Sequence, residues 1–584
     1  MKDFFKFMFA SMLGTFLIIV ILFFMLIGFV IVIISLSSTE EVNIPKNTIL
    51  QISLDQPIFD RTPKIPFFME VGKKIGLYDI LKNIKKAKSD DNIKGIYLDI
   101  SYIPIGLAMI DEIRNALLDF KSSGKPVISY SEYYTQEAYY LASVSDKIYL
   151  HPEGMILFKG INANMLFLKG ALGKLDIKMQ VIRHGKFKAA SEPLFLDKMS
   201  AENREQVTGL ITNSWNTILK GISLARNIST ERLNNIADSL TAQTPEEALK
   251  NKLVDQLAYK DEFMKDMKHL LNLPEKKEIS VIAIDKYMYA VEKNKKRILE
   301  KNKIAIIYAW GDIIEGNGNE QSIGSEKLSK AIRKAREDSK IKAIVLRVNS
   351  PGGGSLASDV IWREVMLASK AKPVVASFGN VAASGGYYIA CHATRIIADP
   401  TTITGSIGVF AIVPDFKGFF NNKLGITFDN VKTNANSDYI PVTSPLSPYQ
   451  TLMLQNAVEK TYSSFISKVA EGRHLTIAKV DSIGQGRVWS ATDARKIGLI
   501  DDFGGMDKAI EVAAKLANIT DYRLIALPEQ KDPLEEMFDR LTGNNTSSIL
   551  EKELGENYKY FKYIKEIQEM KGVQARMPFE IILN

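Results

Sequence analysis

Two segments in the second half of the chain carry the residue types of a covalent acyl-transfer catalyst. The first, N-S-P-G-G-G at 349–354, directly follows a β-branched apolar run. Glycines there let backbone N–H groups approach a ligand without a Cβ, so they could form an oxyanion hole. The second, G-N-V-A-A-S-G-G-Y-Y at 379–388, places Ser384 among small residues at the expected start of a helix. A developing negative charge is favoured there, so we predict a nucleophilic serine.

Each segment also has a purely structural interpretation. The glycines could form only a tight turn between a strand and a helix, and Ser384 could be a helix cap, because serine caps are common. The chemical interpretation gains weight only if the chain also supplies a general base for the serine.

Comparison of the two halves of the chain identifies a candidate base. The 584 residues repeat with an offset near 248, at which Ile93 aligns with Ile341 and Leu98 with Leu346. Such self-similarity indicates two copies of one domain. The further matching blocks are 125–129 with 372–376, 138–143 with 386–391, 146–152 with 394–400, and 246–257 with 492–503. The predicted domains are 1–39 (cytoplasmic stub and membrane anchor), 46–275 (first copy), 276–301 (linker), 302–527 (second copy) and 528–584 (charged helical extension).

The two copies have lost complementary residues. At the position of Ser384 the first copy has Gln136, and opposite the glycine segment it has S-Y-I-P-I-G at 101–106. The first copy instead holds Lys188, where the second has Asn436. One copy keeps a serine and the other a lysine, which favours a single site built from both. A lone lysine is otherwise a solvated surface charge.

A lysine acts as a general base only when it is neutral. Its pKa must then fall from about 10.4 to roughly 7–8, which burial can cause. Phe187, Ala189 and Ala190 offer an apolar setting for Lys188. Glu192 opposes this expectation, because a nearby carboxylate would favour the charged form.

The elements that must position these residues alternate between strands and helices. Residues 342–348 read as a buried strand, 355–370 have helical spacing, and 373–377 form the next strand. Alternation of this length predicts βαβ units and a mostly parallel sheet in each copy. In the C-terminal extension, 533–542 and 548–571 read as amphipathic helices for packing or oligomer contacts.

The N-terminus predicts a membrane anchor. Residues 7–36 contain no charge and exceed the roughly 20 residues that cross a bilayer, and they are too long for the core of a cleaved signal peptide. Lys2 and Lys6 precede the span, whereas Glu40 and Glu41 follow it. The positive-inside rule then keeps the N-terminus in the cytoplasm and places the large body on the extracytoplasmic side of the inner membrane.

Composition excludes several other classes of protein. A hydrophobic share of 46% and a charged share of 24% are those of a globular protein. Cys391 is the only cysteine and there are five histidines, so we expect no internal disulfide, no zinc-type site and no metal or other cofactor. A net charge of +8 over this length is a weak argument for nucleic acid, and we expect no nucleic-acid partner.

These segments resemble the signal peptide peptidase A family, in its long, tandem-domain bacterial form. The most specific similarities are N-S-P-G-G-G, the A-A-S-G-G-Y-Y block around Ser384, and G-x-F-K-A-A-x-E-P around Lys188, and the resemblance covers about 1–520. It implies an α/β fold, a tandem repeat of two ClpP/crotonase-like βαβ spiral domains after one transmembrane helix. It further implies a membrane-anchored serine endopeptidase that degrades cleaved signal peptides and other apolar peptides, assembled as a homotetramer.

By the same resemblance, Ser384 is the nucleophile and Lys188 the general base. The backbone N–H groups of Gly353 and Gly385 form the oxyanion hole, and Ser406 hydrogen-bonds the lysine. One departure is that related sequences often have Tyr-Lys-Ser where this chain has Phe-Lys-Ala at 187–189.

Two alternatives stay open from the sequence. In the first, an α/β-hydrolase triad uses the A-x-S-x-G pattern at 382–386 with His474 or His392. The nucleophile of that fold directly follows a strand, whereas the strand predicted here ends at Ser377. In the second alternative, the repeats form a non-catalytic membrane scaffold.

Overall fold

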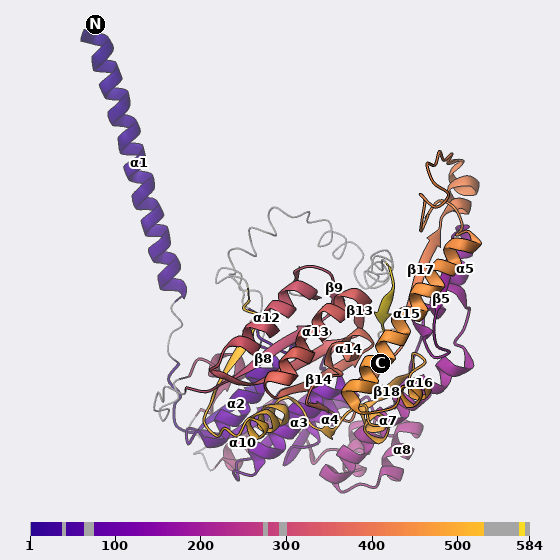
Figure 1. Ribbon diagram of the computed structural model, residues 1–584. Helices are drawn as coiled ribbons and strands as arrows, with labels where there is room; N and C mark the ends of the chain where they lie inside the picture. The colour runs from indigo at the N-terminus through magenta and orange to yellow at the C-terminus, as the bar shows by residue number, and fades with distance from the viewer. Residues whose placement is uncertain are drawn as a thin grey trace.

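The computed structural model describes residues 2–37, 42–63, 75–271, 278–290, 301–319, 321–530 and 572–577. The first helix, α1 (Lys2–Ser37), extends away from the rest of the described chain (Figure 1). Its segment Asp3–Met25 has a mean hydropathy of 2.6, is unburied, and is long and apolar enough to cross a membrane. The predicted helices at 533–542 and 548–571 lie outside the described residues.

The first repeat is built on a six-stranded sheet in the order β6-β4-β3-β2-β1-β7, with every neighbouring pair parallel. Its strands are β1 (Thr48–Ile52), β2 (Ile93–Leu98), β3 (Val127–Tyr134), β4 (Lys147–Ile156), β6 (Gln256–Leu257) and β7 (Ser280–Ala283). Strand β7 and the short helix α11 (Ile284–Tyr287) fall within the stretch interpreted as a linker, so part of that stretch belongs to the first sheet.

The sheet of the second repeat has the order β18-β16-β14-β12-β8-β20. Its part β14-β12-β8-β20 corresponds to β3-β2-β1-β7 of the first repeat. The strands are β8 (Lys303–Trp310), β12 (Ile341–Ser350), β14 (Val374–Ala383), β15 (Arg395–Ala398), β16 (Ile403–Gly405), β18 (Val488–Ser490), β19 (Asp502–Phe503) and β20 (Arg523–Leu527). Strand β15 pairs with β14 and β19, and the pairing of β16 with β18 is antiparallel. The predicted α/β fold with two repeats and mostly parallel sheets is confirmed.

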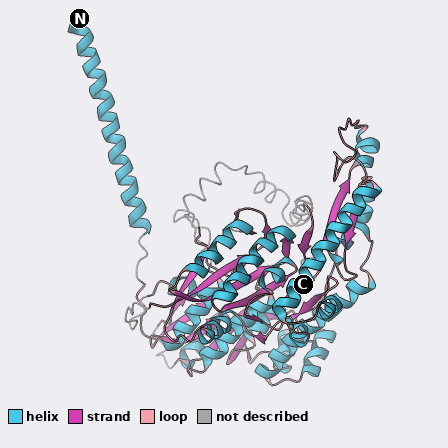
Figure 2. Cartoon of the chain, viewed as in Figure 1, coloured by secondary structure: helices cyan, strands magenta, loops and turns pink. Residues whose placement is uncertain are grey.

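Both sheets are covered on their two faces by helices (Figure 2), which explains the apolar runs of their strands. In β12, for example, Ile344, Val345 and Leu346 are all buried. Corresponding helices recur at the same places in the two repeats. The pairs are α2 (Leu77–Ser89) and α12 (Ser325–Glu337), α3 (Leu107–Lys121) and α13 (Ser355–Ala371), α4 (Gln136–Ala142) and α14 (Gly385–Ala390), α7 (Ala201–Arg226) and α15 (Pro448–Arg473), α8 (Thr230–Ser239) and α16 (Ile477–Ile483), α9 (Pro245–Lys250) and α17 (Ala491–Lys496), and α10 (Lys260–Leu270) and α18 (Met506–Leu516).

A third sheet joins segments from the whole chain, in the order β10-β11-β9-β13-β21-β17-β5. Its members are β5 (Lys178–Arg183), β9 (Asp312–Ile314), β10 (Gly318–Asn319), β11 (Ser322–Gly324), β13 (Gly352–Gly354), β17 (Phe410–Asp415) and β21 (Gln574–Arg576). Strand β5 of the first repeat pairs antiparallel with β17 of the second, with Arg183 opposite Phe410. Because of this pairing, the segment that follows β5 lies against the second repeat.

Candidate active site

Ser384 stands between the end of β14 and the start of α14. Its φ is +53° and its ψ −114°, a backbone conformation that L-residues rarely adopt and that is found at functional sites. Its N–H donates to the carbonyl oxygen of Gly405 at 2.8 Å. The strand runs to Ala383, so the argument that it ends at Ser377 was wrong. It continues because residues up to Ala383 pair with β16.

Lys188 follows β5 and precedes the short helices η1 (Ala189–Ser191) and α6 (Glu192–Phe195). Its loop is held against the second repeat because the Phe187 N–H donates to the carbonyl oxygen of Gln485 at 2.9 Å. A Cβ on Gly408 would lie 3.3 Å from the lysine Cδ, and one on Gly486 would clash with its backbone. These glycines therefore allow the lysine chain to pack deep inside the second repeat.

The structure brings Lys188, Ser384 and Ser406 together. Lysine Nζ lies 2.9 Å from Ser384 Oγ, 3.0 Å from Ser406 Oγ and 3.1 Å from the Ser406 carbonyl oxygen. All three residues are 0% exposed. The amine is therefore directed at the serine hydroxyl by two further acceptors that carry no charge.

Burial lowers the pKa of Lys188 well below its ordinary value. Glu192, which opposed this expectation, is also buried but faces other groups. Its carboxylate accepts hydrogen bonds from Ser200 Oγ at 2.6 Å and Asn203 Nδ2 at 2.8 Å, and Arg183 lies 3.8 Å away. The carboxylate is satisfied by these groups, and among the described residues no carboxylate pairs with the lysine.

The two glycines assigned to an oxyanion hole lie on segments that contact each other, strand β13 and the start of α14. Gly353 in β13 has a φ of +154°, and a Cβ there would clash with the backbone of Ile313. A Cβ on the preceding Gly352 would lie 2.7 Å from the backbone nitrogen of Gly385, the first residue of α14. The glycine strand and the N-terminus of α14 are thus in contact, an approach that side chains would prevent.

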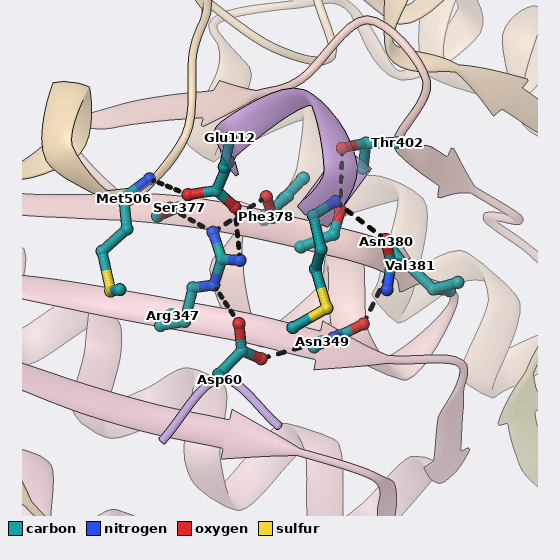
Figure 3. A network of polar contacts seen from close by, with 12 residues as sticks. Asp60, Glu112, Arg347, Asn349, Ser377, Phe378, Asn380, Val381, Thr402 and Met506 are labelled. Atoms are coloured by element: carbon teal, nitrogen blue, oxygen red, sulfur yellow. Dashed lines mark hydrogen bonds and ion pairs between the residues drawn. The ribbon is translucent and has the colours of Figure 1, made fainter. Parts of the chain in front are cut away.

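A buried ionic network between the repeats supports this arrangement (Figure 3). Arg347 on β12 donates to Asp60 at 2.7 Å and to Glu112 at 2.6 Å, both from the first repeat. Asn349, which opens the glycine segment, donates to Asp60 at 3.3 Å and accepts from the Val381 N–H at 3.2 Å. The network therefore connects the first repeat to both strands that carry site residues. The network was not predicted from the sequence, although Arg347 inside an apolar strand was a signal for it.

Gln136 aligns with Ser384 and Asn436 aligns with Lys188, and neither residue has the environment of the residue with which it aligns. Gln136 accepts hydrogen bonds from the N–H groups of Lys159 and Gly160, at 3.2 and 2.9 Å. Asn436 is exposed. His392, considered as a triad member, accepts from Trp362 Nε1 at 2.8 Å and lies 3.6 Å from Glu471. Within the described ranges, no cluster of three or more His, Cys, Asp or Glu side chains could hold a metal ion.

Comparison with known proteins assigns the chain to a family. The profile of peptidase family S49 matches residues 119–274 and 366–520, one match in each repeat. "Protease 4" of Salmonella typhi is 38% identical over 80% of this chain and 76% of its own length. "Protease 4" of Haemophilus influenzae is 35% identical, over 77% and 74%. "Serine protease SPPA, chloroplastic" of Arabidopsis thaliana is 32% identical, over 86% and 74%.

Among solved structures, ClpP1 of Listeria monocytogenes matches with a TM-score of 0.24 and 14% identity, over 35% of this chain and 94% of its own. With two matches to the family profile and relatives that are proteases along most of its length, the chain is a serine peptidase and belongs to peptidase family S49.

Proposed function

We propose that the chain is a membrane-anchored endopeptidase that cuts peptides with a Ser384–Lys188 dyad. The observation that carries the proposal is the 2.9 Å contact between Lys188 Nζ and Ser384 Oγ in a buried site. A general base must lie within hydrogen-bond reach of the proton that it takes, and its pKa must suit the task. The lysine meets the first condition, and its lowered pKa supports the second.

In the proposed mechanism, neutral Lys188 takes the proton of Ser384 as Oγ attacks the scissile carbonyl carbon. The N–H groups of Gly353 and Gly385 stabilise the resulting oxyanion. The lysine ammonium then gives its proton to the leaving amine, and an acyl-serine ester remains. Neutral lysine next takes a proton from water, whose oxygen attacks the ester, and Ser384 regains a proton when the acid leaves. Ser406 keeps the amine directed at Ser384 through its Oγ and its carbonyl oxygen.

We also propose the location and the substrates. Helix α1 anchors the chain in the inner membrane, and the positive-inside rule places the body on its outer face. Cleaved signal peptides are apolar segments left in that membrane, so an anchored peptidase would meet them there. On the resemblance noted above, we further propose that the protein assembles as a homotetramer. Sedimentation of the protein in detergent tests this oligomeric state.

Covalent labelling tests the dyad. A fluorophosphonate should label the full-length protein on one serine, identified by mass spectrometry as Ser384. Ser384→Ala should abolish labelling, and Lys188→Met should reduce it at least a hundredfold, because the base contributes typically 10²–10⁴-fold. Asn436→Ala is the matched control and should label like the wild type. Undiminished labelling of Lys188→Met would contradict the proposal.

A further inference from the structure

Helix α15 of the second repeat lies along strands β5 and β17 (Figure 1), and it therefore faces the segment that leads from β5 to Lys188. The first residue after β5 is His184. Its N–H donates to the carbonyl oxygen of Val409 at 3.1 Å, which fixes its backbone to the second repeat. His184 thus stands at the start of the loop that carries the candidate base, residues 184–188.

The His184 side chain contacts two residues on one face of α15, Glu459 and Tyr462. Its ring stacks on the Tyr462 ring, with 3.7 Å between the centroids and 22° between the planes. Its Nδ1 lies 2.7 Å from Glu459 Oε2. A carboxylate only accepts hydrogen bonds, so Nδ1 is the donor in this pair. The two contacts together fix both the position and the rotation of the imidazole ring.

Tyr462 connects this histidine to the next helix, α16, and to the turn that follows it. The buried Tyr462 hydroxyl donates to Asp481 Oδ1 at 2.6 Å and accepts from the Gln485 N–H at 3.2 Å. Burial raises the pKa of this hydroxyl, which therefore keeps its proton and remains a donor. Gln485 also donates through Nε2 to Asp481 at 2.6 Å. The backbone of Gln485 is thus fixed relative to the Tyr462 ring.

Gln485 in turn contacts the loop that carries Lys188. Its carbonyl oxygen accepts from the Phe187 N–H at 2.9 Å, and a Cβ on Gly185 would clash with its backbone. A Cβ on the next residue, Gly486, would clash with Lys188 itself. The loop is therefore held at its start by His184 and before Lys188 by Gln485, and Tyr462 contacts both of these residues.

We propose that His184 and Tyr462 are positioning residues, which hold the loop of Lys188 so that its amine stays within reach of Ser384 and shielded from water. The proposal rests on the proposed function, because it takes Lys188 as the general base. A misplacement of about 1 Å in an active site can cost about 10²-fold in rate. A loosened loop would also admit water to the amine and remove the burial that lowers its pKa.

Tyr462→Phe is the sharpest variant, because it keeps the aromatic ring on which His184 stacks and removes only the hydroxyl that holds Gln485. It also keeps every charged side chain near the loop, so a changed pH profile would not come from the loss of one of them. Among the described residues, these side chains are Glu459 on α15, Asp481 on α16, Arg487 beside Phe187, and Arg183, Lys186 and Glu192 on the segment of Lys188 itself.

Hydrogen exchange tests the positioning contacts without any reaction. In the full-length protein in detergent, mass spectrometry measures amide exchange in the peptide that spans 184–190. Tyr462→Phe and His184→Ala should each speed exchange in this peptide about tenfold, because the loop loses one of its two attachments. Tyr139→Phe is the matched control, a buried tyrosine of the first repeat whose hydroxyl donates to the carbonyl oxygen of Leu253 at 2.8 Å, and it should exchange like the wild type. Unchanged exchange in both variants, or exchange that rises equally along the whole chain, would overturn the proposal.

Peptidase kinetics give the second readout. Tyr462→Phe and His184→Ala should lower kcat about tenfold and change KM less than twofold, because both residues act on the base and not on the substrate. In Tyr462→Phe, the ionisation seen in kcat/KM should also move to higher pH, toward the ordinary lysine pKa. Wild-type kcat and an unchanged pH profile, despite faster exchange, would overturn the positioning role. A wild-type protein without peptidase activity, together with the tenfold difference in exchange, would contradict the proposed function and support the contacts that hold the loop.

Discussion

At the scale of single residues, the proposed chemistry depends on an amine that has lost its proton inside the protein. Lys188 lies among uncharged partners, and Glu192 is occupied by Ser200 and Asn203. Lys188 could be predicted from the sequence, because the repeat comparison singled it out from the other lysines. The direction in which the Glu192 side chain points could not be predicted from the sequence. It depends on Ser200 and Asn203, at the start of a neighbouring helix, and not on the distance along the chain from Lys188.

The pH dependence of turnover should report this amine. Because burial lowers the pKa of Lys188, kcat/KM should increase with pH along one ionisation below the ordinary lysine range and then level off. A pH series with an uncharged peptide measures it. A rise that follows only the ordinary lysine pKa would argue against a buried base.

The same lowered pKa makes a stability prediction. Between the lowered pKa of Lys188 in the folded chain and the ordinary lysine pKa of about 10.4, the unfolded chain binds a proton that the folded chain lacks, so in this window the residue makes stability increase with pH. Lys188→Met removes the free-energy cost of burying the lysine amine and should stabilise the protein by about 1–2 kcal/mol at pH 7. Thermal unfolding at pH 7 and pH 10 tests this, and the gain should shrink at pH 10. A destabilised variant at pH 7 would contradict it.

At the scale of elements, the residues of the proposed site come together because short segments cross between the repeats. The βαβ units were predictable, since their apolar runs and helices have regular periods. The third sheet was not, because β5 pairs with β17 far away in sequence and strands such as β13 are three residues long. Ser377 was wrongly taken as a strand end for a related reason: the small residues up to Ala383 lack the β-branched pattern yet still pair with β16.

The ionic network between the repeats offers a test at this scale. Arg347→Met leaves Asp60 and Glu112 buried without their cation and should cost about 3–5 kcal/mol in urea unfolding. The matched control is the triple variant with Asp60→Asn and Glu112→Gln added, which removes both uncompensated carboxylates. It should recover more than half of the loss, and no recovery would assign the cost to packing alone.

At the scale of the whole molecule, the proposed site is divided between two repeats of similar fold. The segment Asp3–Met25 of helix α1 is unburied, and the two sheets have their own apolar cores. Residues 46–584, made without the anchor, should therefore be soluble and keep peptidase activity without detergent. Aggregation of this fragment, with activity only when 1–45 are present, would contradict the independence of the body from its anchor.

The central claim is that Ser384 and Lys188 act as one unit, and a double-mutant comparison of kcat/KM in the full-length protein tests it most directly. Residues that act together lose activity non-additively. Ser384→Ala, Lys188→Ala and the double variant should therefore be inactive to the same degree, and Lys188→Arg should match them because a guanidinium does not deprotonate in proteins. Gln136→Ala is the control and should keep wild-type turnover. Wild-type kcat/KM in Lys188→Arg, or a loss in the double variant equal to the product of the two single losses, would contradict the account.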